Sequence, residues 1–129
     1  MAESRLTDAE LRHFEALLRR DRAEGAADLD RLTGSLGAVR EARSDASADD
    51  EHDPDGPTLS TEWSRLSGVH SEGVERLTAI DRALERIAEG GYGVCLRRGE
   101  QIDRARLEAR PAATLCIDCA RELESGQRT

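Results

Sequence analysis

The chain has 129 residues and a formal net charge of −8, with 37% hydrophobic, 36% charged and 2% aromatic residues. This balance excludes a large globular core and favours exposed amphipathic helices, either as one domain or as one elongated unit with a small appendage. No apolar run is long enough to span a bilayer and the N-terminus lacks the regions of a signal peptide, so we expect a cytoplasmic protein with no membrane partner.

The negative charge is concentrated in residues 1–89, which carry 12 arginines against 21 acidic residues, whereas residues 90–129 carry 7 against 6. Nucleic-acid phosphates repel an acidic chain of this kind. We therefore expect no direct DNA binding and favour a basic groove on another protein as the partner.

The first predicted helix begins at Thr7, where Thr7-Asp8-Ala9-Glu10 is a capping-box pattern. A stripe of apolar residues at spacings of three and four predicts that the helix runs to about Arg43; its members are Leu11, Phe14, Leu17, Leu18, Leu29, Leu32, Leu36 and Val39. The stripe has a gap at 19–28, and each helix glycine costs about 1 kcal/mol relative to alanine. A bent or locally weak helix is expected.

Residues 44–57, SDASADDEHDPDGP, change in composition to clustered carboxylates with two prolines and a glycine. These residues predict a turn. One interpretation is a flexible acidic loop, and the other is a tip that offers carboxylates to a metal or to a basic site.

The second predicted helix runs from about Ser60 to Glu89 and has an unbroken heptad seam, formed by Trp63, Leu66, His70, Gly73, Leu77, Ile80, Leu84 and Ile87. At 1.5 Å per residue it would be roughly 45 Å long. It matches the first helix as an antiparallel hairpin. We interpret His70 as a seam residue that is satisfied by a neighbour, and Gly73 as a weak point of the seam.

The third segment, residues 90–129, holds the three cysteines. Cys95-Leu96-Arg97-Arg98 and Cys116-Ile117-Asp118-Cys119 are separated by 17 residues, which would be a strong structural-zinc signal if Arg98 were cysteine. Arginine has no lone pair for a metal. Two alternatives stay open: zinc held by three thiolates and a water or nearby side chain, or an empty site.

In the empty alternative, Arg98 lies among the thiols or pairs with a carboxylate such as Asp118. Apolar packing would then maintain the small unit, around Tyr92, Ile102, Leu107 and Ile117.

Two long helices with an acidic turn, followed by GYGVC and RLEARPAATLCIDCA, resemble the DksA/TraR zinc-finger family of bacterial transcription regulators. The resemblance covers roughly Leu11 to Glu122 and is most specific from Tyr92 to Ala120. It implies a protein that binds RNA polymerase without binding DNA, inserts its coiled coil through the secondary channel, and alters initiation. It also implies that Cys95, Cys116 and Cys119 are zinc ligands.

The family's tip carries two aspartates three residues apart, followed by an alanine. This chain matches that tip in character rather than in sequence. The resemblance implies that Asp53 and Asp55 act at the tip, with Asp50 as the third candidate.

The family's response to the alarmone ppGpp implies basic residues at three positions, which are Ala79, Arg110 and Ala120 in this chain. Because two of the three charges are missing, we expect weak or absent synergy with ppGpp. Arg110 is either a nucleotide or polymerase contact or a structural residue that packs against the ribbon.

The predicted fold is mainly α: a long antiparallel helical hairpin, or coiled coil, over residues 1–89 with its acidic tip at 44–57, and a small zinc-ribbon-like unit with a short terminal helix over 90–129. We expect a monomer. No nucleophile, base and orienter are grouped, so we do not expect an enzyme. Two other functions are weighed: a thiol redox sensor that forms a Cys116–Cys119 disulfide, and a structural coiled-coil adaptor.

Overall fold

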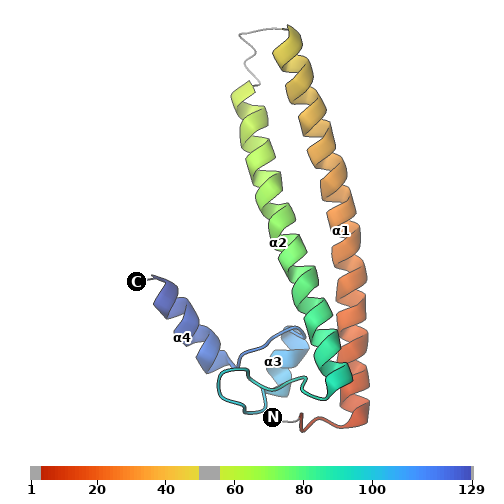
Figure 1. The fold of residues 1–129 in the computed structure, drawn as a ribbon, viewed down its shortest axis with the longest axis vertical. Coiled ribbons are helices and arrows are strands. Elements are labelled where there is room, and N and C mark those ends of the chain that lie inside the picture. Colours follow the sequence, from red (N-terminus) through yellow and green to blue (C-terminus); the bar gives the residue numbers. More distant parts are fainter. Residues whose placement is uncertain (1–3, 50–55, 129) are drawn as a thin grey trace. The chain divides into compact units, whose positions relative to one another are not determined.

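The computed structural model describes residues 4–49 and 56–128, with side chains described over 4–45 and 59–126. These residues form four helices in chain order: α1 (Asp8–Asp49), α2 (Gly56–Glu89), α3 (Arg104–Ala109) and α4 (Ile117–Arg128). The described ranges contain no strand, only an isolated antiparallel bridge between Val94 and Gln101. The prediction of a mainly helical chain with two long paired helices is confirmed (Figure 1).

The start of α1 is fixed by the predicted capping box. The Thr7 hydroxyl oxygen accepts a hydrogen bond from the Glu10 N–H at 3.1 Å, and Glu10 Oε1 accepts one from the Thr7 N–H at 3.0 Å. Two amides that the first helical turn leaves without intrahelical partners are thereby satisfied.

Both long helices extend into the segment expected to be a turn. α1 continues past Arg43 to Asp49, and α2 already begins at Gly56. Pro57 is compatible with this start because a proline in the first helical turn lacks only an N–H that has no intrahelical acceptor. The tip candidates Asp50, Asp53 and Asp55 lie outside the described residues.

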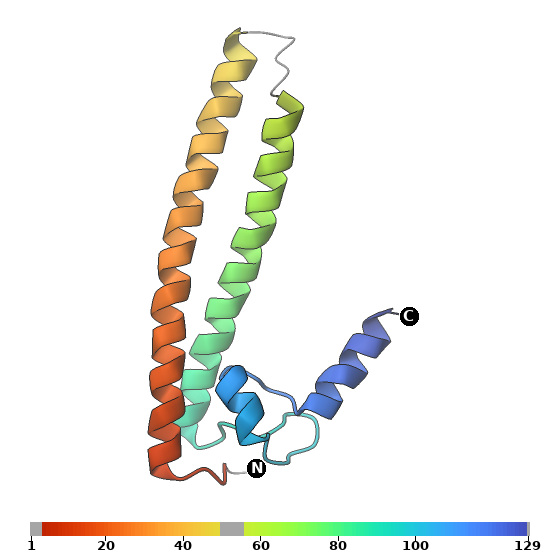
Figure 2. The ribbon, with the colours of Figure 1, turned by 180° about the vertical axis from the view of Figure 1, so that it is seen from behind.

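The chain forms two units, residues 1–22 with 78–129 (unit 1) and residues 23–77 (unit 2). Within each unit α1 and α2 run side by side in opposite directions (Figures 1 and 2). Every residue of the α2 seam is buried or half-buried, from Trp63 to Ile87, whereas most of the intervening residues are exposed. The heptad prediction is confirmed.

In unit 2, two glycines allow α1 and α2 to approach closely. A Cβ on Gly73 would lie 2.7 Å from Leu29 Cδ2, and a Cβ on Gly25 would lie 3.1 Å from Leu77 Cδ2. Each glycine thus accepts a leucine from the opposite helix. Gly73 was expected to weaken the seam, and instead it is the place where Leu29 packs. α1 is also one continuous helix across residues 19–28, where a weak stretch was expected.

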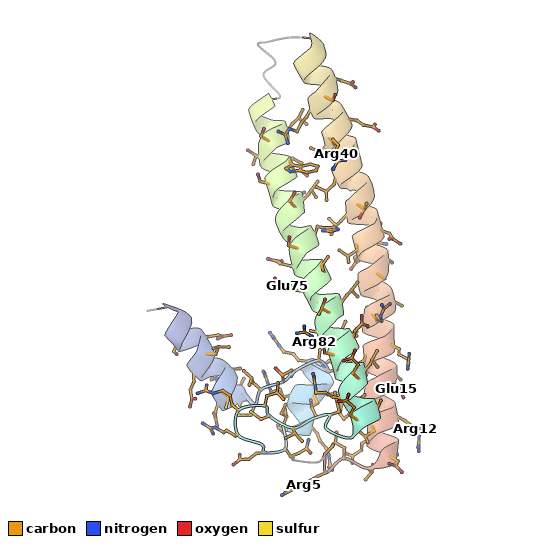
Figure 3. All side chains as sticks on the ribbon, in the orientation of Figure 1. Arg5, Arg12, Glu15, Arg40, Glu75 and Arg82 are labelled. Atoms are coloured by element: carbon orange, nitrogen blue, oxygen red, sulfur yellow. The ribbon has the colours of Figure 1, made fainter. Side chains whose placement is uncertain are left out.

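Trp63 of α2 lies beside two arginines of α1 in unit 2. The guanidinium carbon of Arg40 is 5.5 Å and that of Arg43 is 6.0 Å from the ring centroid, and Figure 3 labels Arg40 on α1. Contacts of this kind at partly exposed sites are worth about 0.5–1 kcal/mol. They add a cross-helix attraction where the apolar seam is thin.

The core of unit 1 joins the paired helices to the C-terminal segment. Phe14 packs against Tyr92 with ring centroids 5.8 Å apart, and Tyr92 is fully buried. Its hydroxyl donates to the Pro111 carbonyl oxygen at 2.7 Å, and burial raises the pKa of this phenol. The predicted core residues Ile102 and Leu107 are also fully buried. The prediction is wrong for Ile117, which is 45% exposed.

No helix over the described ranges is both long enough and apolar enough to cross a membrane.

A paired substitution in α2 tests the close approach of the helices. A Cβ on Gly68 would meet no atom of the described residues within 4 Å, so Gly68→Ala is expected to raise the free energy of unfolding by about 0.5–1 kcal/mol. Gly73→Ala brings the same propensity gain but forces Leu29 aside, at a cost of about 1–3 kcal/mol. Urea unfolding followed by circular dichroism compares the two variants; equal stabilisation would contradict the packing described.

Removal of the Tyr92 hydroxyl tests the core of unit 1. Tyr92→Phe leaves the buried Pro111 carbonyl without this donor, so a loss of about 1–3 kcal/mol in the free energy of unfolding is expected. The control is Thr33→Val, which removes an exposed hydroxyl that donates to Leu29 O at 2.9 Å. Chemical denaturation should show a much smaller change for Thr33→Val, and similar losses for both variants would contradict this account.

Candidate metal centre

The three cysteines converge in unit 1. The Sγ atoms of Cys95, Cys116 and Cys119 lie within 4.8 Å of one another, and all three thiols are free. Cys95 and Cys119 are buried, with 1% and 0% exposure, and Cys116 is half-buried. The sequence placed these residues in one cluster by their spacing, and the structure brings all of them together.

Backbone hydrogen bonds shape the loop that carries Cys95. The Cys95 N–H donates to Glu100 O, and the Gly99 N–H donates to Cys95 O, each at 2.8 Å. Gly99 has φ +70°, a left-handed conformation that glycine adopts without strain. The Leu96 N–H reaches Thr114 O at 2.8 Å and ties this loop to the segment that leads to Cys116.

The other two cysteines flank the start of α4. Cys116 precedes α4 and accepts, through its carbonyl oxygen, a hydrogen bond from the Ala120 N–H at 3.0 Å. Cys119 lies in the first turn of the helix. The spacing of three residues therefore places both sulfurs on the side of α4 that meets the Cys95 loop.

The surroundings shift the pKa values of two thiols in opposite directions. Burial acts to raise the pKa of Cys95, but hydrogen bonds from the backbone at Cys116, Arg98 and Arg97, together with the Cys119 thiol, lower it to about 7. Burial and hydrogen bonds with the other two thiols raise the pKa of Cys119 to about 11, against the charge of Arg98. The thiolate form is therefore favoured at Cys95 relative to Cys119.

Arg98 stands at the sequence position of a fourth ligand and pairs with α4. Its Nη2 donates to Glu122 Oε1 at 3.0 Å, and its Nη1 lies 3.9 Å from Asp118 Oδ2. Arg97 also reaches Glu122, at 3.3 Å. The pKa of Arg98 is raised, first by the charge of Cys119 and then by Glu122 and Cys116.

The sequence pointed to Asp118 as the carboxylate partner and missed Glu122, which makes the shorter contact. A signal was available, because Glu122 follows Asp118 by four residues and so lies on the same face of a helix. Of the two expected positions of Arg98, the pairing with a carboxylate is observed, with Asp118 and Glu122.

The donor set fits three coordination positions of zinc. Structural zinc takes four ligands in a tetrahedron, and within the described ranges no fourth histidine, cysteine or carboxylate joins the cluster. The guanidinium of Arg98 has no lone pair to donate. Cys95, Cys116 and Cys119 would hold a zinc ion, whose role in such a site is structural, and its fourth ligand would come from solvent.

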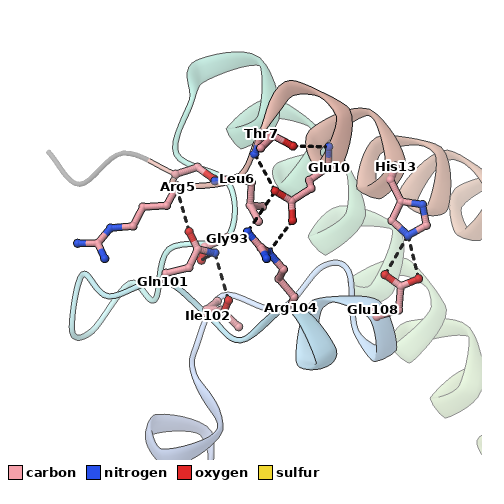
Figure 4. A network of polar contacts seen from close by, with 11 residues as sticks. Arg5, Leu6, Thr7, Glu10, His13, Gly93, Gln101, Ile102, Arg104 and Glu108 are labelled. Carbon is pink, nitrogen blue, oxygen red and sulfur yellow. Dashed lines mark hydrogen bonds and ion pairs between the residues drawn. The ribbon is translucent and has the colours of Figure 1, made fainter.

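A polar network in unit 1 attaches the start of α1 to the segment around α3 (Figure 4). Arg104 donates to both carboxylate oxygens of Glu10, and His13 Nε2 lies 2.8 and 2.9 Å from the carboxylate oxygens of Glu108.

Gln101 adds contacts with the residues that precede α1 and Cys95. Its side-chain amide accepts a hydrogen bond from the Arg5 N–H at 3.0 Å and donates one to Gly93 O at 2.8 Å. These contacts, which sequence reasoning missed, brace the loop that leads to Cys95.

Arg110 follows the short helix α3 and is exposed. Its backbone N–H donates to Arg106 O at 2.7 Å and ends the helix. The structural alternative, in which the Arg110 side chain packs against the ribbon, is not favoured by this exposure. Ala79, also exposed, and Ala120, half-buried, are the other two positions that the ppGpp response implies.

The family described as prokaryotic dksA/traR C4-type zinc finger matches residues 90–125. RNA polymerase-binding transcription factor DksA of Caulobacter vibrioides is 44% identical over 52 residues, which are 40% of this chain and 37% of that protein. The protein of the same name from Escherichia coli K12 is 27% identical over 117 residues, which are 91% of this chain and 73% of that protein. The match thus spans little more than a third of the Caulobacter protein.

The fold is also similar to a solved structure, that of transcription factor DksA2 from Pseudomonas aeruginosa. The TM-score is 0.77 and the sequence identity 30%, over 95% of this chain and 88% of that one. This similarity extends over both long helices as well as the cysteine segment.

Proposed function

Because this chain belongs to the DksA/TraR family, we propose that it is a transcription regulator that binds RNA polymerase directly. The observation that carries the proposal is the similarity to a solved transcription factor over 95% of the chain, at 30% identity. A relative whose name describes it as RNA polymerase-binding is similar over 91% of the chain. Both comparisons reach well beyond the cysteine segment.

The proposed mechanism acts through the connection between α1 and α2. α1 ends at Asp49 and α2 begins at Gly56, so the connection contains Asp50, Asp53 and Asp55. In the proposal this acidic tip enters the secondary channel of the polymerase. Carboxylates are hard oxygen ligands that Mg²⁺ and basic side chains attract, so the tip is drawn toward the catalytic magnesium and modulates initiation.

Charge supports a protein partner rather than DNA. The chain carries a net charge of −8, and residues 1–89 hold the excess of carboxylates. A duplex would repel this surface, because DNA binding depends on the neutralisation of phosphates by basic side chains. We propose that the protein acts as a cytoplasmic monomer on the polymerase, without direct DNA contact and without catalysis of its own.

The C-terminal segment has a supporting role in this proposal. The network around Glu10 and Arg104, together with the burial of Tyr92, fixes the loop of Cys95 against the first turns of α1. The segment thereby stiffens unit 1. Arg110, exposed after α3, is the proposed contact with the polymerase or a nucleotide.

Neutralising the tip is expected to leave polymerase binding intact and to weaken the effect on initiation. In a pull-down with core RNA polymerase, Asp53→Asn/Asp55→Asn should retain binding, because the tip acts after docking, while the change in initiation measured by in vitro transcription falls about tenfold or more. The matched control is Asp30→Asn/Glu41→Gln, which removes two exposed charges from the side of α1. Failure of the wild-type chain to bind polymerase would overturn the proposal. An equal loss of the effect on initiation in the control would show that the tip has no specific role.

The response to ppGpp is expected to be weak. Each missing charge-assisted phosphate contact removes about 1.5–3 kcal/mol, and alanine replaces a basic residue at two of the three positions. Addition of ppGpp to the transcription assay should change the effect of the wild-type chain only slightly. The double variant Ala79→Lys/Ala120→Lys should gain a response that the wild type lacks, whereas strong synergy in the wild type would contradict the prediction.

A further inference from the structure

The cysteine cluster provides a closed set of three sulfur donors. Cys95, Cys116 and Cys119 have their Sγ atoms within 4.8 Å of one another, and the described part of the chain adds no fourth ligand-type side chain. Tetrahedral zinc would therefore need a solvent ligand at this site. An atom that forms only three bonds would need no solvent ligand.

Arg98 stands at the sequence position of a fourth ligand but cannot act as one. Its guanidinium cannot donate a lone pair, and it is paired with Glu122 at 3.0 Å and with Asp118 at 3.9 Å. The site thus combines three soft donors with an arginine at the sequence position of a fourth ligand.

We infer that this cluster is a binding site for trivalent arsenic, taken up as arsenous acid. As(OH)₃ is neutral, and its arsenic forms three bonds while a lone pair takes the fourth direction. Three S–H groups condense with three As–OH groups: three As–S bonds form, three As–O bonds break and three waters leave. Neither arsenic nor sulfur changes oxidation state, and no charge is added beside Arg98. Soft thiolates select such thiophilic centres over hard ones.

Burial and preorganisation favour this complex. Cys95 and Cys119 are 1% and 0% exposed, so water has little access to bonds formed there, whereas the half-buried Cys116 gives the incoming molecule an entry point. The hydrogen bond from the Leu96 N–H to Thr114 O holds the two cysteine segments together before any ligand arrives. Little conformational entropy remains to be lost on binding.

The test uses the full, reduced chain and sodium arsenite, and it is independent of the proposed role at RNA polymerase. Native mass spectrometry should show one arsenic per chain with three protons lost, and ultraviolet absorption should show As–S charge transfer. Cys116→Ser should weaken binding about tenfold or more, since one of three bonds is lost. Binding of wild type and Cys116→Ser with equal affinity would overturn the inference, as it would show two-thiol capture.

A second pair of variants keeps the inference testable if Cys116→Ser fails to fold. Arg98→Cys supplies a fourth thiol and should retain zinc against arsenite and against a mild chelator, whereas arsenite should displace zinc from the wild type. The control is Arg97→Cys, which adds a thiol at the neighbouring exposed position and should behave as the wild type does. A wild-type chain that keeps one zinc in the presence of excess arsenite would contradict the inference.

Discussion

The burial of Tyr92 between the paired helices and the C-terminal segment is the constraint on which unit 1 depends. The ring packs against Phe14, and the hydroxyl donates to Pro111, so one side chain joins α1 to the segment that leads to Cys116. The described part of that segment has two short helices and a single bridge. A unit with so few regular elements buries little apolar area and needs a fixed anchor.

The cysteine cluster is built on this anchor. Cys95 comes three residues after Tyr92, and Cys116 follows Pro111 within the same segment, so the hydrogen bond from Tyr92 and the one from Leu96 hold both sides of the cluster. Arg98 and Glu122 then link the loop to α4 by an ion pair with both side chains about half exposed. Such a pair contributes about 1 kcal/mol or less, so it orients α4 more than it stabilises it. The cluster therefore depends on the apolar core for its position.

In unit 2 the pairing of α1 and α2 depends on leucines that pack against glycines. Leu29 packs against Gly73 and Leu77 packs against Gly25, so the helices meet where side chains are smallest. Propensity alone counts each of these glycines as a cost. At Gly25 and Gly73, however, the absence of a side chain favours packing, because a missing Cβ makes room for a leucine from the other helix. Gly25 lies within the expected weak stretch of α1, which is a continuous helix.

Sequence patterns were sufficient to predict the helical pairing, the α2 seam, the capping box at Thr7 and the meeting of the three cysteines. The helical features follow from local periodicity, and the meeting of the cysteines follows from two motifs with the spacing of a zinc site. The folded chain was needed to show which glycines pack, that Ile117 is exposed, and that Arg98 pairs with Glu122. It also showed that Glu10 binds Arg104 and that His13 binds Glu108. Those outcomes depend on contacts between residues far apart in sequence, and local patterns supply at most one partner of such a contact.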